Sequence, residues 1–331
     1  TAYNNLGIAC NEVGKYNDAI KNFLAALRFD KNNYLARKNI INILNFYRPI
    51  NFEKNPILKL NQKISEIDNK IQTKNLNNPE EIKKIFSANN DIVKTLGTNF
   101  VLDETEIFRR NSKNLNCIRH FKIFNEFNVI PKFCFSCYKI QITLFNVLDL
   151  VRLYFIFNNL SLKKNNIRKC MIEMRNNIKG NYKGYIYCEG LDEAKTISNK
   201  LNKIIKETYS QEFKIEIKHG CSEFYNSYPD FKNINFNGNQ KMEYRAEWET
   251  KESIVDKRIP ARYNNDKKII GITIKGISLS DILIIKNWLA FAKMLDDHSY
   301  KLIYEDQIET HFIEKILTPQ LAFRKNELKF N

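Results

Sequence analysis

Apolar residues in the first part of the chain recur at helical spacing. Residues 2–33 read AYNNLGIACNEVGKYNDAIKNFLAALRFDKNN, with apolar positions three or four residues apart. Gly14 interrupts this pattern, which therefore predicts two helices joined by a short turn. Small residues stand where two such helices would approach each other closely, at Gly7, Ala19 and Ala26. A third helix is predicted over 34–47, before Pro49.

This pattern resembles a tetratricopeptide repeat, a helix pair of about 34 residues. The matching positions are Tyr3, Leu6, Gly7, Ala19, Phe23 and Ala26, whereas Cys10 and Lys31 replace the usual aromatic residue and proline. The resemblance covers residues 2–33 and implies that residues 1–48 end a helical array that binds a protein partner. Because the chain starts at Thr1 inside the repeat, we expect a fragment with stacking repeats upstream. The alternative is that this repeat only caps the array.

Residues 49–110 carry weaker patterns. The segment NPEEIKKIFSANNDIVKTLG predicts a helix with Asn78 as its N-cap and Pro79 at its first position. The residues before it are amphipathic and then polar. We therefore interpret 49–110 as a helical linker.

Beyond residue 137, strand and helix patterns follow each other in a definite order. Alternating segments predict strands at 138–143, 169–175, 185–188 and 213–219, and helical periodicity predicts helices at 145–160 and 191–209. This is the βαββαβ order of a ferredoxin-like fold. The predicted class is α+β, with a ferredoxin-like domain at 111–225 after the helical repeat and linker.

Residues 226–331 are predicted to form a C-terminal extension that packs on this domain. A short strand is expected at 272–276 and a helix at 278–297, where Ser278 and Asp281 have the spacing of a capping box.

Period-two alternation divides the strand residues between two faces. The face toward the helices is predicted to hold Ile140, Ile142, Cys170, Ile172, Met174, Ile186, Cys188, Ile215 and Ile217. The other face is predicted to hold Lys139, Gln141, Glu173, Arg175, Tyr185, Tyr187, Lys214 and Glu216.

The second set, over 137–219, resembles an RNA-recognition motif, whose third strand carries the pattern [KR]-G-[FY]-[GA]-[FY]-[VIL]-x-[FY]. The corresponding residues here are KGYIYCEG, in which Lys183, Gly184, Tyr185 and Tyr187 match and Ile186, Cys188 and Gly190 do not. The resemblance implies that Tyr185 and Tyr187 stack on bases while Lys139, Lys183 and Arg175 contact phosphates. The alternative is that both tyrosines pack beneath the C-terminal segment.

The cysteines suggest a second kind of site. In a ferredoxin-like sheet, the starts of the first two strands and the ends of the last two meet at one edge. The candidates there are Cys134, Cys137, Cys170, Cys188, Cys221 and His219, with Cys170 expected almost opposite Cys188. Such ligands suit zinc or an iron–sulfur cluster. Parity places Cys137 on the opposite face from Cys170, Cys188 and Cys221, so buried structural thiols or a reactive thiol stay open as alternatives.

Composition limits the partners and the compartment only loosely. The formal net charge of +16 favours a polyanionic partner, although AT-rich coding would also enrich lysine. Seven cysteines without disulfide-like spacing favour a reducing cytoplasm. The most apolar run, 144–157, contains Asp149 and Arg152 and is too short for a membrane span, so no membrane partner is expected.

The sequence thus predicts an adaptor that binds a protein partner through its repeats, beside a cysteine-rich ferredoxin-like module with a possible metal. One alternative is binding of single-stranded RNA at the sheet. A second is an enzyme that uses the cysteines, for which the sequence suggests no substrate.

Overall fold

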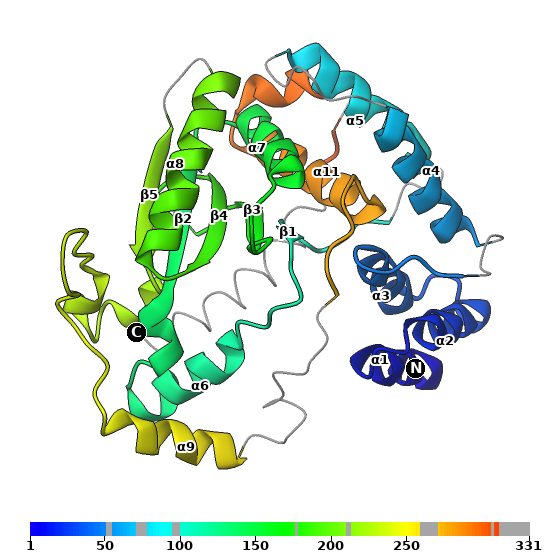
Figure 1. Cartoon of the computed structure of the whole chain (residues 1–331). Helices are drawn as coiled ribbons and strands as arrows, with labels where there is room; N and C mark the ends of the chain where they lie inside the picture. The colour runs from blue at the N-terminus through cyan, green and yellow to red at the C-terminus, as the bar shows by residue number, and fades with distance from the viewer. Residues whose placement is uncertain are drawn as a thin grey trace.

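The computed structural model describes residues 1–50, 55–70, 78–94, 100–175, 178–209, 213–258, 271–305 and 308–310. Within these residues five strands form one antiparallel sheet in the order β1-β3-β4-β2-β5 (Figure 1). Their bounds are Glu106–Arg109 for β1, Cys137–Leu144 for β2, Arg168–Ile172 for β3, Tyr182–Glu189 for β4 and Lys214–His219 for β5. The protein therefore has mixed α+β structure.

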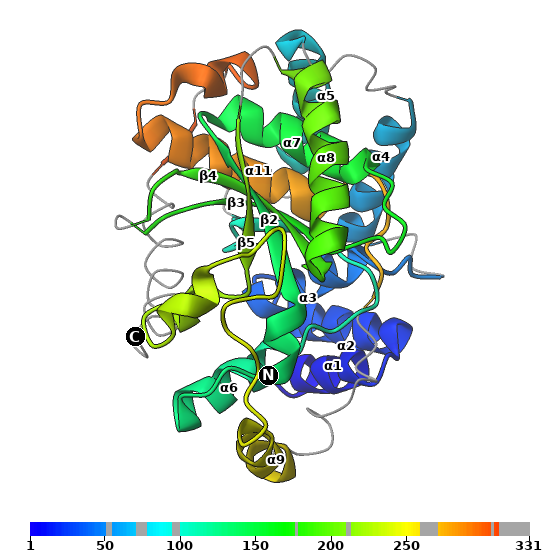
Figure 2. The ribbon, with the colours of Figure 1, turned by 60° about the vertical axis from the view of Figure 1, so that its left-hand side comes forward.

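Two helices cover one face of the sheet. The helix α7 (Val147–Asn159) connects β2 to β3, and α8 (Leu191–Thr208) connects β4 to β5. Both pack on the central strands (Figure 2). Gly184 of β4 permits the close approach of α7, because a Cβ atom there would lie 2.3 Å from Leu153. We call this side of the sheet the helical face.

The chain begins with three helices near the β1 edge of the sheet (Figure 1). They are α1 (Ala2–Glu12), α2 (Tyr16–Phe29) and α3 (Tyr34–Leu44), and they form where the sequence predicted helices. Gly7 lies against the Phe23 ring, which a Cβ atom would approach within 2.4 Å. The prediction that small residues mark the close contact of α1 and α2 is confirmed at this position.

The helices α4 (Pro56–Lys70), α5 (Pro79–Lys94) and α11 (Leu279–Met294) pack together. The Asn78 side chain accepts a hydrogen bond from the Glu80 amide at the start of α5, and Ser278 and Asp281 form the predicted capping box of α11. Buried apolar residues from Ala19 in α2 to Ile303 pack together in one hydrophobic core. The predicted linker 49–110 therefore contributes to the main core.

A second, smaller core lies at the start of β2. It joins α6 (Cys117–Phe127), the short helix η1 (Lys132–Ser136) and α9 (Trp248–Arg258) to the turns η2 (Ser222–Phe224) and η3 (Pro229–Lys232). The last described helix, η4 (His298–Leu302), contacts α7 and α11.

Two predicted details of the C-terminal half and the linker were wrong. Residues 272–276 do not form a strand, since their backbone makes only isolated hydrogen bonds, such as Thr273 to Arg110 and Ile274 to Asn45. The additional strand is instead β1, which lies inside the predicted linker and pairs with β3.

Candidate functional site

The side of the sheet opposite α7 and α8 carries charged and aromatic side chains; we call it the polar face. Its members in the strands include Glu106, Phe108, Lys139, Gln141, Lys169, Lys183, Tyr185 and Tyr187. Tyr185 and Tyr187 are half-buried, as are Phe108 and Lys169. The predicted division of β2 and β4 between two faces agrees with their burial, because Ile140, Ile186 and Cys188 are buried on the helical face.

A row of aromatic and basic residues crosses three neighbouring strands of this face. Phe108 on β1 pairs with Lys169 on β3, which pairs with Tyr185 on β4. The Lys169 ammonium lies 5.5 Å from the centroid of the Phe108 ring and 5.4 Å from that of Tyr185. It is therefore held between the two rings by cation–π attraction, and Glu106 forms an ion pair with it at 3.1 Å.

Two further cations extend this row. The Lys139 ammonium lies 5.8 Å from the centroid of the Tyr185 ring, and the Arg110 guanidinium lies 3.9 Å from that of Phe108. Within the described part of the chain, no carboxylate forms an ion pair with either residue. Burial raises the pKa of the Tyr185 and Tyr187 phenols, so both rings are neutral at physiological pH.

Lys183 and Arg175, the other two predicted phosphate contacts, are already paired. Both lie against Glu173, with Arg175 at 2.8 Å and Lys183 at 3.4 Å. Burial would raise the pKa of the Glu173 carboxyl, but the hydrogen bonds and charge of Arg175 lower it to about 2. Burial lowers the pKa of the Lys183 ammonium to about 8, because Glu173 is shared with Arg175 and compensates only in part. Both cations are therefore assigned a structural role in the fold. Lys183 is 2% exposed and is not accessible to a phosphate.

A groove of about 620 Å³ lies beside the aromatic row. The sheet side of the groove is formed by Glu106, Phe108 and Arg110, and the helix side by residues of α1 and α3 that include Ile8, Asn11, Glu12, Asn39 and Asn42. The Asn11 Oδ1 atom is buried and accepts no hydrogen bond from the described residues. The groove thus connects the polar face of the sheet to the first helices.

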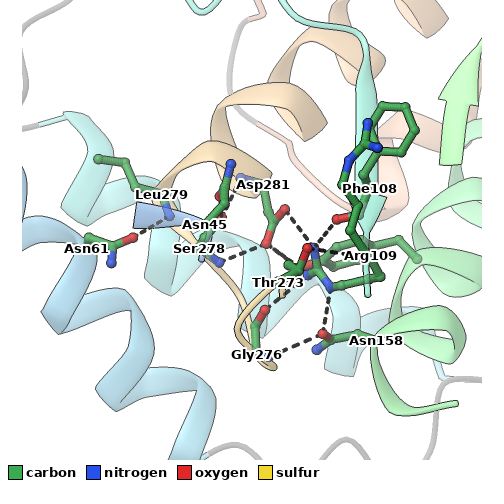
Figure 3. A network of polar contacts seen from close by, with 12 residues as sticks. Asn45, Asn61, Phe108, Arg109, Asn158, Thr273, Gly276, Ser278, Leu279 and Asp281 are labelled. Carbon is green, nitrogen blue, oxygen red and sulfur yellow. Dashed lines mark hydrogen bonds and ion pairs between the residues drawn. The ribbon is translucent and has the colours of Figure 1, made fainter. Parts of the chain in front are cut away.

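A second cavity, of about 580 Å³, has the buried ion pair Arg109–Asp281 in its lining. Figure 3 shows the hydrogen bonds of this pair. Arg109 bonds Asp281 through two nitrogens, at 2.9 and 3.2 Å, and also donates to Tyr154, Asn158 and the Gly276 carbonyl. Both charged residues are at most 5% exposed. Since every guanidinium nitrogen has a partner, this network joins β1, α7 and α11 and offers no free group to a ligand.

The structure separates Cys170 from the other predicted metal ligands, whereas Cys137 lies within electrostatic range of Cys134, Cys188 and Cys221. Cys170 pairs with Gly184 rather than lying opposite Cys188, because the β3–β4 register runs from Arg168 opposite Ile186 to Ile172 opposite Tyr182. The offset of four residues separates the two cysteines by ~13 Å along the strands. Cys188 lies opposite Tyr138 on the helical face, while Cys221 lies within electrostatic range of Lys139 on the polar face. Among the described residues, no three His, Cys, Asp or Glu side chains are arranged to hold a metal ion.

The chemistry of the individual groups agrees with a structural role. His219 is buried, and its Nδ1 and Nε2 atoms lie 2.8 and 2.9 Å from the Phe231 and Phe135 carbonyl oxygens. Both ring nitrogens therefore lie against backbone carbonyl oxygens, and the one that carries the proton donates to its carbonyl. Burial raises the pKa of the Cys134 and Cys221 thiols, and it raises that of Cys137 to about 11. These sulfurs are protonated at neutral pH, which is the unreactive form of cysteine.

Sequence reasoning missed Phe108, Lys169 and Arg110. The only signal was the alternation of residues 106–109, which is too short to distinguish a strand from a loop. Lys169 was included in a predicted strand, but its position between two rings depends on the unpredicted pairing of β1 with β3.

Comparison of the chain with protein-family models, with curated proteins and with solved structures gave no match. Among the described helices, none combines the length and the apolar character that a membrane crossing requires.

Proposed function

We propose that the protein binds single-stranded nucleic acid on the polar face of its sheet. One observation carries this proposal: Phe108, Lys169 and Tyr185 form a continuous ring–ammonium–ring row across three strands. Aromatic rings on a sheet bind unpaired bases by stacking, and each stacked base contributes ~1–3 kcal/mol. A duplex keeps its bases stacked on one another, so such a row favours a single strand.

The charge distribution supports the same ligand. Lys139 and Arg110 lie beside the rings without carboxylate partners among the described residues, so their charges are available to phosphates. The formal net charge of +16 would attract a polyanion at long range. In contrast, Lys183 and Arg175 are paired with Glu173 and are assigned a structural role.

The topology also supports the proposal. The order β3-β4-β2-β5, with α7 and α8 on one face, resembles the arrangement of a ferredoxin-like domain, the fold class to which RNA-recognition motifs belong. Tyr185 and Tyr187 of β4 match the first two aromatic positions of the RNA-recognition pattern. The third aromatic of that motif is missing, and Phe108 on the added strand β1 supplies a ring elsewhere on the same face.

The test is binding of short fluorescent oligonucleotides, followed by anisotropy at low and moderate salt. The double variant Tyr185→Ala/Tyr187→Ala is expected to bind at least about tenfold more weakly. Tyr185→Phe keeps the ring and is expected to bind like the wild type. Tyr3→Ala, on α1 and 44% exposed, serves as the matched control. Absence of wild-type binding at low salt would eliminate the proposal.

A second candidate is the adaptor function implied by the resemblance to a tetratricopeptide repeat. It is favoured by exposed apolar side chains on the first two helices, notably Tyr3, Leu6 and Phe29. Phe29 is 81% exposed and stacks on Tyr3 at 5.6 Å. Such a patch is typical of a protein–protein contact.

The adaptor function is tested by affinity capture with the wild type, Phe29→Glu and Tyr185→Ala/Tyr187→Ala. A protein retained by the wild type and by the tyrosine variant, but lost with Phe29→Glu, would support it. Ile118→Glu, at an 83% exposed position on α6, controls for the added charge. Equal retention by all four proteins would argue against this surface as the contact.

A further inference from the structure

The second cavity, of about 580 Å³, lies between α3, α4 and the segment that precedes α11. Each of these three elements contributes a buried apolar side chain to its lining, namely Leu44, Leu58 and Ile277. A volume of this size is typical of sites that hold small organic molecules. The cavity can therefore hold a ligand that has an apolar part.

Three cationic side chains line the same cavity. Arg48, Lys59 and Lys275 are exposed, and none of them forms an ion pair within the described part of the chain. One of the two carboxylates in the lining belongs to the buried ion pair described above and is neutralised by its partner. The other belongs to Glu66, so the lining keeps an excess of two positive charges. This charge attracts an anion, and a dianion more strongly than a monoanion.

Two side-chain amides of the lining have donors without partners. The Leu279 backbone N–H donates to Asn61 Oδ1 at 3.0 Å, and the Ser278 hydroxyl donates to Asn45 Oδ1 at 2.8 Å. These bonds hold both oxygens toward the start of α11, so the two Nδ2 groups are turned away from it (Figure 3). Neither Nδ2 atom donates to a described residue, and both are accessible to solvent. They are therefore available to donate hydrogen bonds to a ligand.

From these observations we propose that the cavity binds a small phosphate monoester whose organic part is apolar. A phosphate monoester carries roughly two negative charges at neutral pH and presents about three acceptor oxygens. These properties match the charge excess and the unpartnered amide donors of the lining, while the organic part lies against the apolar side chains. This inference does not depend on the proposed function, because Lys139, Lys169 and Tyr185 are not part of the cavity lining.

The test is isothermal titration calorimetry with naphthyl phosphate and with its two separate parts, naphthol and inorganic phosphate. At about pH 8 the monoester is fully ionised, because its second pKa is about 6. The wild type is expected to bind naphthyl phosphate at least about tenfold more tightly than either part. Naphthoate, which has the same ring system and a single charge, is expected to bind about three- to fivefold more weakly than naphthyl phosphate.

Two substitutions in the lining test the site itself. Lys59→Gln removes one cation and is expected to weaken naphthyl phosphate about threefold while leaving naphthol unchanged. Lys63→Gln is its matched control, since Lys63 is exposed on the same helix and does not line the cavity. Asn61→Asp keeps the acceptor for the Leu279 N–H and replaces the amide donor with a carboxylate oxygen, so it is expected to weaken naphthyl phosphate at least about tenfold. Asn5→Asp, at an exposed position of α1, controls for the added charge.

Three results would contradict this inference. If naphthyl phosphate bound no more tightly than naphthol, the proposal would be overturned. Equal losses in Lys59→Gln and Lys63→Gln would mean attraction by net charge alone and would overturn the site. Equal affinity for naphthoate would overturn the assignment of a phosphate. Oligonucleotide binding on the polar face is expected to be the same in Asn61→Asp and Asn5→Asp, so failure of this inference and failure of the proposed function are distinguishable.

Discussion

The two faces of the sheet are built from the same strands but differ in how their charged side chains are paired. On the helical face, the charged pair Arg109 and Asp281 is buried, and every guanidinium nitrogen has a partner. On the polar face, Lys139 and Arg110 lie beside aromatic rings without carboxylate partners among the described residues. The first arrangement connects β1 to α7 and α11, whereas the second leaves charge available to a ligand.

Alternation along a strand places residues that stabilise the fold on one face and residues available to a ligand on the other. Arg109 and Arg110 are neighbours in sequence, yet the first points to the helical face and the second lines the groove. A buried charge requires partners fixed by the fold, while a half-buried one can exchange water for a ligand. Substitutions on the helical face should therefore change unfolding, and substitutions at the unpaired cations should change binding.

The largest effect is expected for Arg109→Met. This change leaves the Asp281 carboxylate buried without its bidentate partner, and we expect a loss of about 3–5 kcal/mol in the free energy of unfolding, measured by urea denaturation. The double variant Arg109→Met/Asp281→Asn should recover part of this loss. Arg28→Met, on the exposed side of α2, is the control and should stay within about 0.5 kcal/mol of the wild type. If Arg109→Met were as stable as that control, the buried ion pair would not contribute to stability as proposed.

Glu173→Gln tests the buried ion cluster that Glu173 forms with Arg175 and Lys183 on the polar face. The pKa of Glu173 is lowered from 4.5 to about 2, so its ionised form stabilises the folded protein above pH ~4.5. That stabilisation is lost as pH falls from 4.5 toward 2. The variant should be less stable by about 2–3 kcal/mol at pH 6, and the difference should shrink toward pH 2. Glu247→Gln, at an exposed position, should show no such trend; a pH-independent difference for Glu173→Gln would contradict the pairing.

The main elements were predictable because each has a long local pattern. The strand β2 alternates over eight residues, and α11 begins at a capping box that the spacing of Ser278 and Asp281 already indicated. The strand β1 has only four residues, and its role depends on pairing with β3, some sixty residues later. When two distant segments pair, the residue pattern within each segment does not show which partner it has.

The candidate site was predictable only where it followed from parity. Tyr185, Tyr187 and Lys139 were assigned to the correct face, but the pairing of Lys183 with Glu173 depends on where the hairpin turns. The same register error placed Cys170 opposite Cys188. A shift by an even number of residues, such as the four residues that separate Gly184 from Cys188, preserves the face of each residue and changes every cross-strand neighbour. Faces are therefore more predictable than contacts.

Gly184→Ala and a change at the next residue, Tyr185, test the two faces of the single strand β4. The new Cβ atom would lie 2.3 Å from Leu153 and 3.3 Å from Phe157 on the helical face, so the variant should lose about 1–3 kcal/mol of stability. Combining it with Leu153→Ala should relieve the clash and show non-additive behaviour. Tyr185→Leu, at the next residue on the polar face, is expected to cost less because its ring is half-buried. The reverse order of unfolding midpoints would contradict the assignment of faces.

Lys139→Gln is expected to have the smallest effect on stability and a specific effect on binding. Because Lys139 has no carboxylate partner among the described residues, its loss should leave the unfolding midpoint almost unchanged. Removing one phosphate contact should lower the slope of log affinity against log salt by about 0.7 for a single strand. Lys203→Gln, on the exposed side of α8 behind the helical face, keeps the same change in net charge and should leave the slope unaltered. Equal slopes for the two variants would mean that Lys139 acts only through the overall charge of the protein. That result would contradict phosphate binding on the polar face.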